Sequence, residues 1–228
     1  SFQEKITYEE IELRTAKLAL SLRTKFGLLS GCKVALAMEN CSDFLVILIA
    51  CWRAGLVVVP INFKLHAKEF EYIFADAKVS LVFASEPIAT KLETTRDIIT
   101  IGTRDYKNLT LGDYYSDQNF SLTEEAWIFY TSGTTGTPKG AVLTHQNLLH
   151  MCFSYYADIE FVAHDETILH AAPMSHGSGL YGLPFLLKGA QNAIPESGQF
   201  DPDLIFDAIR KYNKLSFFAA PTMIKKLV

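Results

Sequence analysis

The chain has 228 residues, of which 49% are hydrophobic and 20% are charged, and its formal net charge is −4. This apolar content predicts a globular protein with a sizeable core and excludes disorder as its main state. Without a basic excess the chain cannot hold a nucleic-acid backbone strongly, so we expect no nucleic-acid partner. The longest apolar run, residues 44–52, is too short to span a membrane.

Cysteine usage favours a reducing compartment. The four cysteines, Cys32, Cys41, Cys51 and Cys152, form no CxxC pair, and a disulfide framework would be sparse in a chain of this length. No secretory leader is recognisable, so we expect a cytoplasmic protein. The histidines form no cluster with metal-ligand spacing, and we expect no metal ion held by protein ligands alone.

The first half of the chain alternates helical and strand patterns. Apolar residues recur every three to four positions through residues 8–26, which predicts a helix. Further along, the predicted order is strand 33–38, helix 43–54 capped by Ser42 and stopped by Gly55, strand 56–61, helix 67–77 and strand 81–84. Such alternation is typical of an α/β fold in which layered, mostly parallel sheets carry flanking helices.

The second half is less regular. Residues 85–125 predict a strand at 98–101 and otherwise surface connections. Further strands are predicted at 126–130, 141–144, 167–171 and 215–219, and helices at 146–158 and 202–212. Asp201 followed by Pro202 is typical of a helix start. Pro221 begins a last helix that we expect to continue through Val228, because no helix stop signal precedes the end of the chain.

The segment from Thr131 to Gly140, TSGTTGTPKG, carries the strongest chemical signal. Glycines let successive backbone N–H groups converge on an anion, hydroxyls add donors, and Lys139 adds a full positive charge. This combination suits a polyphosphate better than the alternative, a solvated linker, because it lies between two predicted strands. It is not the Walker pattern, since five residues separate Gly133 from Lys139 and Gly140 follows the lysine.

Residues 130–145, YTSGTTGTPKGAVLTH, resemble the signature loop of the adenylate-forming superfamily, which includes acyl- and aryl-CoA synthetases and peptide-synthetase adenylation domains. Segments 6–22, 54–65, 173–180 and 200–228 resemble further parts of that family in the expected order. One departure is Cys32, where the family usually has Asp. The resemblance implies that residues 1–228 are the N-terminal portion of the AMP-binding large domain, without its remainder and C-terminal lid, and that this portion alone is inactive.

The resemblance also implies the chemistry. It implies a ligase that activates a fatty or aryl acid as an acyl-adenylate and transfers it to CoA, with ATP, Mg²⁺ and CoA as the small molecules involved. Lys139 and His176 are the implied catalytic residues, and His176, Gly177 and Gly179 are implied to bind the acid. The residues implied to bind the ATP phosphates are Thr131, Ser132, Gly133, Thr134, Thr135, Gly136 and Lys139. Two related activities remain open: a peptide-synthetase adenylation domain and an acyl-AMP ligase.

Residues 177–182, GSGLYG, also fit the G-x-G-x-x-G pattern and follow the strand predicted at 167–171. They therefore allow a dinucleotide-binding oxidoreductase as an alternative, and close packing of small residues as another. Residues 173–176 separate the strand from the glycines, and no acidic residue ends a strand about 20 residues further on, which disfavours a dinucleotide. A non-catalytic binding module is the remaining alternative.

Overall fold

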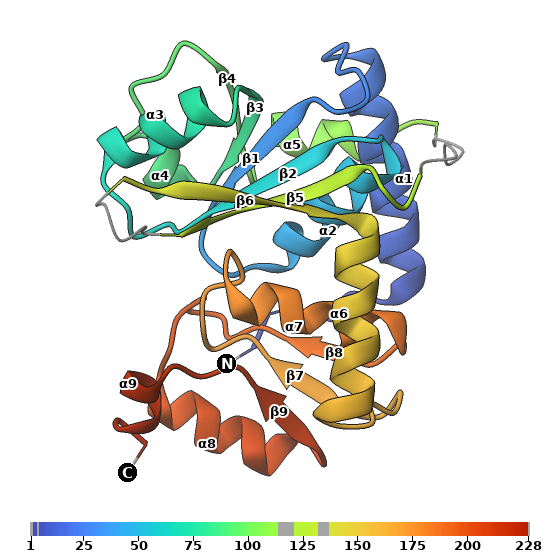
Figure 1. Ribbon diagram of the computed structural model, residues 1–228, viewed down its shortest axis with the longest axis vertical. Helices are drawn as coiled ribbons and strands as arrows, with labels where there is room; N and C mark the ends of the chain where they lie inside the picture. The colour runs from blue at the N-terminus through green and yellow to red at the C-terminus, as the bar shows by residue number, and fades with distance from the viewer. Residues whose placement is uncertain (1, 4, 114–120, 132–136, 228) are drawn as a thin grey trace. The chain divides into compact units, whose positions relative to one another are not determined.

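The computed structural model describes residues 2–3, 5–113, 121–131 and 137–227 (Figure 1). The chain forms two compact units. The larger unit contains residues 6–38 and 43–146, and the smaller unit contains residues 1–5, 39–42 and 147–228.

The larger unit is built on a six-stranded sheet with strand order β4-β3-β1-β2-β5-β6 (Figure 1). Its strands are β1 (Lys33–Ala37), β2 (Val57–Ile61), β3 (Val79–Ala84), β4 (Asp97–Thr100), β5 (Glu125–Thr131) and β6 (Lys139–Thr144). All neighbouring pairs are parallel except β5 and β6, which form an antiparallel hairpin. The predicted α/β class with a mostly parallel sheet is therefore confirmed.

Helices cover both faces of this sheet. They are α1 (Tyr8–Thr24), α2 (Ser42–Arg53), α3 (Ala67–Asp76), α4 (Glu86–Ala89) and α5 (Arg104–Leu109). Successive side chains of a strand point to opposite faces. Trp127 of β5 accordingly packs on Phe44 of α2, with ring centroids 6.5 Å apart, whereas the next residue, Ile128, joins the cluster that contains Phe70 and Phe74 of α3.

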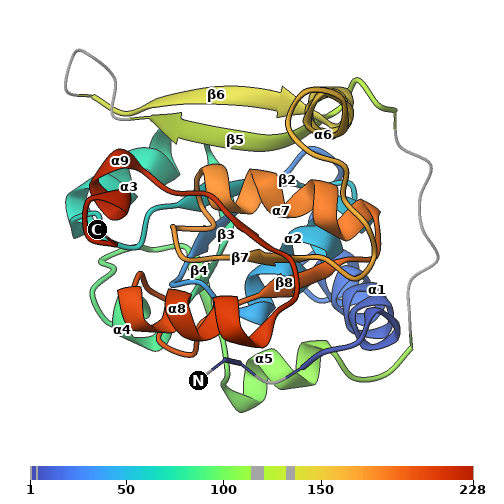
Figure 2. The same ribbon diagram turned by 90° about the horizontal axis from the view of Figure 1, so that it is seen from below.

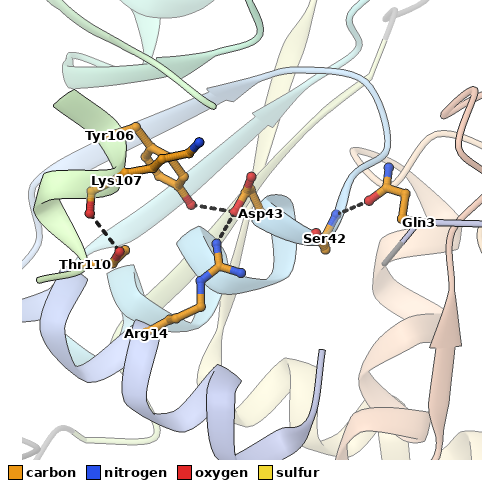
Figure 3. Close-up of polar contacts among 7 residues, drawn as sticks. All are labelled: Gln3, Arg14, Ser42, Asp43, Tyr106, Lys107 and Thr110. Atoms are coloured by element: carbon orange, nitrogen blue, oxygen red, sulfur yellow. Dashed lines mark hydrogen bonds and ion pairs between the residues drawn. The ribbon is translucent and has the colours of Figure 1, made fainter. Parts of the chain in front are cut away.

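The prediction that residues 85–125 are surface connections outside one strand is wrong, because they also contain α4 and α5. Tyr106 of α5 is buried, packs edge-on against Phe83 at 6.2 Å, and donates from its hydroxyl to Asp43 Oδ1 at 2.8 Å. Arg14 of α1 donates to the same oxygen (Figure 3). A six-residue helix offers too few turns for a periodic pattern, so only these tertiary contacts reveal it.

The smaller unit contains a three-stranded parallel sheet with strand order β8-β7-β9. Its elements are α6 (His145–Asp158), which starts in the larger unit, β7 (Thr167–Leu169), α7 (Gly177–Leu187), β8 (Gln191–Ala193), α8 (Pro202–Lys211), β9 (Leu215–Phe217) and α9 (Pro221–Ile224). Helices α7 and α8 cover opposite faces of the sheet (Figure 2). Ile168 therefore packs with Phe185 of α7, and Leu169 packs with Ile205 of α8.

The ends of the last two helices test the predicted boundaries. Helix α8 begins as predicted, with the Asp201 carboxylate accepting from the backbone N–H of Asp203. The prediction that the last helix continues through Val228 is wrong: α9 ends at Ile224. Beyond Ile224, the N–H groups of Lys226 and Leu227 donate to the carbonyl oxygens three residues earlier, which is the bonding of tight turns and not of an α-helix. No helix in the described residues is long and apolar enough to cross a membrane.

Candidate functional site

The predicted phosphate loop joins β5 to β6. Its central residues, Ser132, Gly133, Thr134, Thr135 and Gly136, lie outside the described residues. The structure places its two ends: Thr131 ends β5 and Lys139 begins β6, directly opposite each other in the hairpin. Opposed residues of an antiparallel pair project from the same face, so the Thr131 hydroxyl and the Lys139 ammonium lie on one side of the hairpin.

Lys139 is exposed, and it forms no ion pair with any other residue that the structure describes. A lysine ammonium in this position can meet an anion held by the adjoining loop. The exposed Thr131 hydroxyl can add a hydrogen bond to the same anion. The two ends of the loop therefore supply a cation and a donor on one face.

The next pair in the hairpin, Tyr130 and Gly140, anchors the base of the loop. A Cβ on Gly140 would lie 2.8 Å from Ile128 Cγ2 and 2.9 Å from Tyr130 Cζ. The absence of a side chain at Gly140 therefore makes room for the tyrosine ring. The Tyr130 hydroxyl donates to Asp76 Oδ2 at 2.5 Å, at the end of α3. Burial and the neighbouring carboxylate both raise the pKa of Tyr130, which keeps the phenol protonated as a donor.

Sequence reasoning missed this anchor. Asp76 is 54 residues from Tyr130, and neither residue lies in a spacing pattern that would connect them. In the sequence, Gly140 is distinguished only by its place after Lys139. In the structure, the absence of a side chain at Gly140 leaves room for Ile128 and the Tyr130 ring of the neighbouring strand.

The predicted acid-binding segment is a tight turn that leads into α7. The backbone N–H of His176 donates to Pro173 O at 3.0 Å, and the N–H of Gly179 donates to His176 O at 3.1 Å. The half-buried His176 ring donates from Nδ1 to Ser175 O at 2.9 Å. These bonds fix the ring beside the first turn of α7.

The glycines of α7 have close-packed surroundings. A Cβ on Gly177 would lie 2.7 Å from the Phe218 ring, and one on Gly179 would lie 1.9 Å from Met174 O. A Cβ on Gly182 would lie 2.9 Å from His170 Cε1 and from Asn192 Oδ1. Packing thus explains all three residues, and the acid-binding role of Gly177 and Gly179 stays a prediction. Because the protein's own atoms fill these spaces, the geometry disfavours a dinucleotide there.

A buried polar cluster fixes α7 to β7 and β8. His170 is fully buried, with Nδ1 2.9 Å from Ser178 Oγ and Nε2 2.8 Å from Asn192 Oδ1. An amide oxygen only accepts, so Nε2 carries the proton and Nδ1 accepts from the Ser178 hydroxyl. Burial lowers the pKa of His170 to about 4, which keeps the ring neutral near pH 7.

The two predicted sites belong to different units: Thr131 and Lys139 to the larger, and His176, Gly177 and Gly179 to the smaller. In the part of the chain that the structure describes, the first offers the Lys139 ammonium and the Thr131 hydroxyl, and the second a polar ring at a turn, while their roles stay predictions. Among the described residues, no group of three His, Cys, Asp or Glu side chains could hold a metal ion.

The chain belongs to the AMP-binding enzyme family, whose sequence model matches residues 1–228. It is 33% identical to a feruloyl-CoA synthase from an Amycolatopsis species, with 97% of this chain and 45% of that protein covered. Bacitracin synthase 2 from Bacillus licheniformis is 27% identical over 98% of this chain and 8% of that protein. ATP-bound MatB from Rhodopseudomonas palustris has a similar fold, with a TM-score of 0.84, 28% identity, and coverage of 98% of this chain and 46% of MatB. The chain thus spans about half the length of the CoA synthase and of MatB.

Proposed function

We propose that the chain is part of a ligase that activates a fatty or aryl carboxylic acid with ATP and transfers the acyl group to CoA. The observation that carries this proposal is the 33% identity to a feruloyl-CoA synthase across 97% of the chain. Since the chain covers 45% of that relative, we assign the activity to the full-length protein and expect residues 1–228 alone to be inactive.

In the first proposed step, the carboxylate of the acid attacks the α-phosphate of ATP, and pyrophosphate leaves. Lys139 is exposed at the mouth of the loop assigned to the β- and γ-phosphates, so its ammonium can stabilise the charge that builds on the departing pyrophosphate. The Thr131 hydroxyl adds a donor on the same face. The family resemblance assigns the remaining contacts to residues 132–136.

Mg²⁺ would accompany ATP. This ion prefers phosphate oxygens, waters and one or two carboxylates to a dedicated protein cage. We assign no residue of this chain to the ion.

His176 is the residue we assign to the carboxylate of the acid. The carboxylate is already ionised near pH 7, so the histidine need not remove a proton, and its role is to orient the acid. The turn that fixes its ring beside α7 supports this assignment. In the second step, the CoA thiol attacks the acyl carbon of the adenylate, and AMP leaves.

A second candidate keeps the first step and changes the acceptor. The similarity to bacitracin synthase 2 favours an adenylation domain that activates an amino acid for transfer to a carrier protein. The adenylate chemistry at the hairpin would be the same in both cases.

The test is ATP–pyrophosphate exchange by the full-length protein with aryl acids, fatty acids and amino acids offered separately. We expect exchange that requires an aryl or fatty acid, followed by a CoA thioester when CoA is added. Exchange with amino acids alone, and no thioester with CoA, would favour the second candidate. Absence of exchange with every acid would contradict both.

A further inference from the structure

Asn40 connects two segments of the smaller unit that lie far apart in the sequence. It is 3% exposed and lies in the short stretch 39–42 between β1 and α2. Its Nδ2 donates to the backbone oxygens of His170, at 2.9 Å, and of Ala172, at 2.8 Å. Its Oδ1 accepts from the backbone N–H of Met174 at 2.8 Å. One side chain therefore pairs with alternate residues of 170–174, as a neighbouring strand would.

The segment bound by Asn40 is the one that carries His176. Strand β7 ends at Leu169, together with its ladders to β8 and β9. Beyond that point the chain runs through residues 170–174 into the turn closed by Pro173 O and the His176 N–H. The Met174 carbonyl also packs against Gly179, in the first turn of α7. A shift of residues 170–174 would therefore move both the ring and the start of the helix.

Asn40 is itself held from two sides. Gln3 donates from Nε2 to Asn40 O at 3.3 Å and accepts at Oε1 from the Ser42 N–H at 2.9 Å, a contact seen in Figure 3. Gly198 has φ +64°, and a Cβ there would lie 2.8 Å from Asn40 O. Only a glycine combines that backbone conformation with so close an approach. The amide of Asn40 thus projects from a fixed backbone.

We propose that Asn40 is a positioning residue for the acid site, which acts through residues 170–174 to set the place of His176. This inference rests on the proposed function for the acid, and it assigns Asn40 no contact with the acid itself. The amide suits the task because it combines two donors with an acceptor. An aspartate of the same shape would keep the acceptor for Met174 and lose both donors to His170 O and Ala172 O.

The kinetic test uses the full-length protein with Asn40→Asp and Asn40→Ala. We expect kcat/KM for the acid to fall about 10- to 100-fold in both variants, because a displacement of about 1 Å at a reacting group has an effect of that size. The KM for ATP should stay within about twofold of wild type. This separation of the two substrates is what a general loss of stability would not produce.

Ser21→Ala is the matched control. The buried Ser21 hydroxyl donates to Leu109 O at 2.9 Å, across 88 residues of sequence, within the larger unit. The control removes a buried bond between a side chain and a distant backbone group and leaves residues 170–174 untouched. It should lower the unfolding temperature and change kcat/KM for the acid by less than about twofold.

Hydrogen exchange at the Met174 amide tests the inference without any activity. Asn40→Ala should speed this exchange at least about tenfold, because alanine has no acceptor for the Met174 N–H. Asn40→Asp should leave the amide protected, because the aspartate carboxylate still accepts that bond. A folded Asn40→Asp protein with wild-type kcat/KM for the acid would overturn the inference. So would an equal rise in both KM values, or unchanged Met174 exchange in Asn40→Ala. If the wild-type protein shows no acid-dependent exchange of pyrophosphate, the proposed function fails, and the Met174 measurement still decides whether Asn40 fixes the segment.

Discussion

Replacing Gly140 by alanine tests whether close packing anchors the predicted phosphate loop. The new Cβ would lie 2.8 Å from Ile128 Cγ2 and 2.9 Å from Tyr130 Cζ, where ordinary contacts begin at 3.4 Å. The Tyr130 ring must then move by about half an ångström or more. Its hydroxyl is only 2.5 Å from Asp76 Oδ2, so that hydrogen bond will lengthen or break.

The expected loss of stability follows from these two effects. Overpacking of this kind costs about 1–3 kcal/mol. A hydrogen bond to a charged acceptor contributes roughly 1.5–3 kcal/mol, part of which would be lost as the ring shifts. We therefore expect Gly140→Ala to lower the free energy of unfolding by about 3 kcal/mol, which corresponds to roughly 6–12 °C in the unfolding temperature for a chain of this size.

The assay is urea unfolding of wild type, Gly140→Ala, Tyr130→Phe and the double variant, with one further variant as a control. Tyr130→Phe removes the bond to Asp76 in advance, so Gly140→Ala should cost about 1–2 kcal/mol less in that background. Val142→Thr, at an exposed site of the same strand, is the control and should change stability by less than about 0.5 kcal/mol. A Gly140→Ala protein as stable as wild type, or one whose cost is the same in both backgrounds, would refute the reasoning.

Three further changes have defined outcomes. Lys139→Ala in the full-length protein should slow adenylation about a hundredfold, which corresponds to roughly 3 kcal/mol in the activation free energy. It should slow thioester formation from preformed acyl-adenylate much less, because pyrophosphate has already left. Equal losses of both rates in rapid-quench assays would contradict this role of the lysine. Gly179→Ala, with its Cβ 1.9 Å from Met174 O, should lower the unfolding temperature by several degrees, and an unchanged calorimetric scan would count against the packing described. The pKa of His170 is lowered to about 4 in the folded protein, so the unfolded state binds a proton at a higher pH than the folded state does. Wild type should therefore lose up to about 3 kcal/mol of unfolding free energy as the pH falls from 6.5 to 4. His170→Gln should lose less over that window, and parallel curves of unfolding free energy against pH would show that this histidine does not contribute.

The sequence predicts elements whose signal is local. Short apolar runs mark β1 and β2, and the Asp201-Pro202 pair marks the start of α8. The hairpin loop is recognisable from the sequence because glycines, hydroxyls and one lysine form a composition that suits an anion. Its end residues, Thr131 and Lys139, then face each other as paired residues of a hairpin must.

Features that depend on distant contacts were not predictable in this way. Helix α5 has six residues, and it is revealed by the burial of Tyr106 against Phe83 and its bond to Asp43. Asn40 bonds to Met174 across 134 positions, a distance at which no periodic pattern operates. Side-chain bonds of this kind arise only when the fold brings the segments together, so they require coordinates.

The central claim is that the carboxylate of an acid attacks the α-phosphate of ATP, and an isotope label tests it directly. The full-length protein would be given ATP, CoA and an acid carrying ¹⁸O in both carboxyl oxygens, and the phosphorus-containing products would be examined by mass spectrometry. An acyl-adenylate that is cleaved by the thiol must leave one ¹⁸O atom on AMP. We expect singly labelled AMP and unlabelled pyrophosphate. Label in inorganic phosphate with ADP as the other product, or AMP without label, would contradict the proposed attack on the α-phosphate.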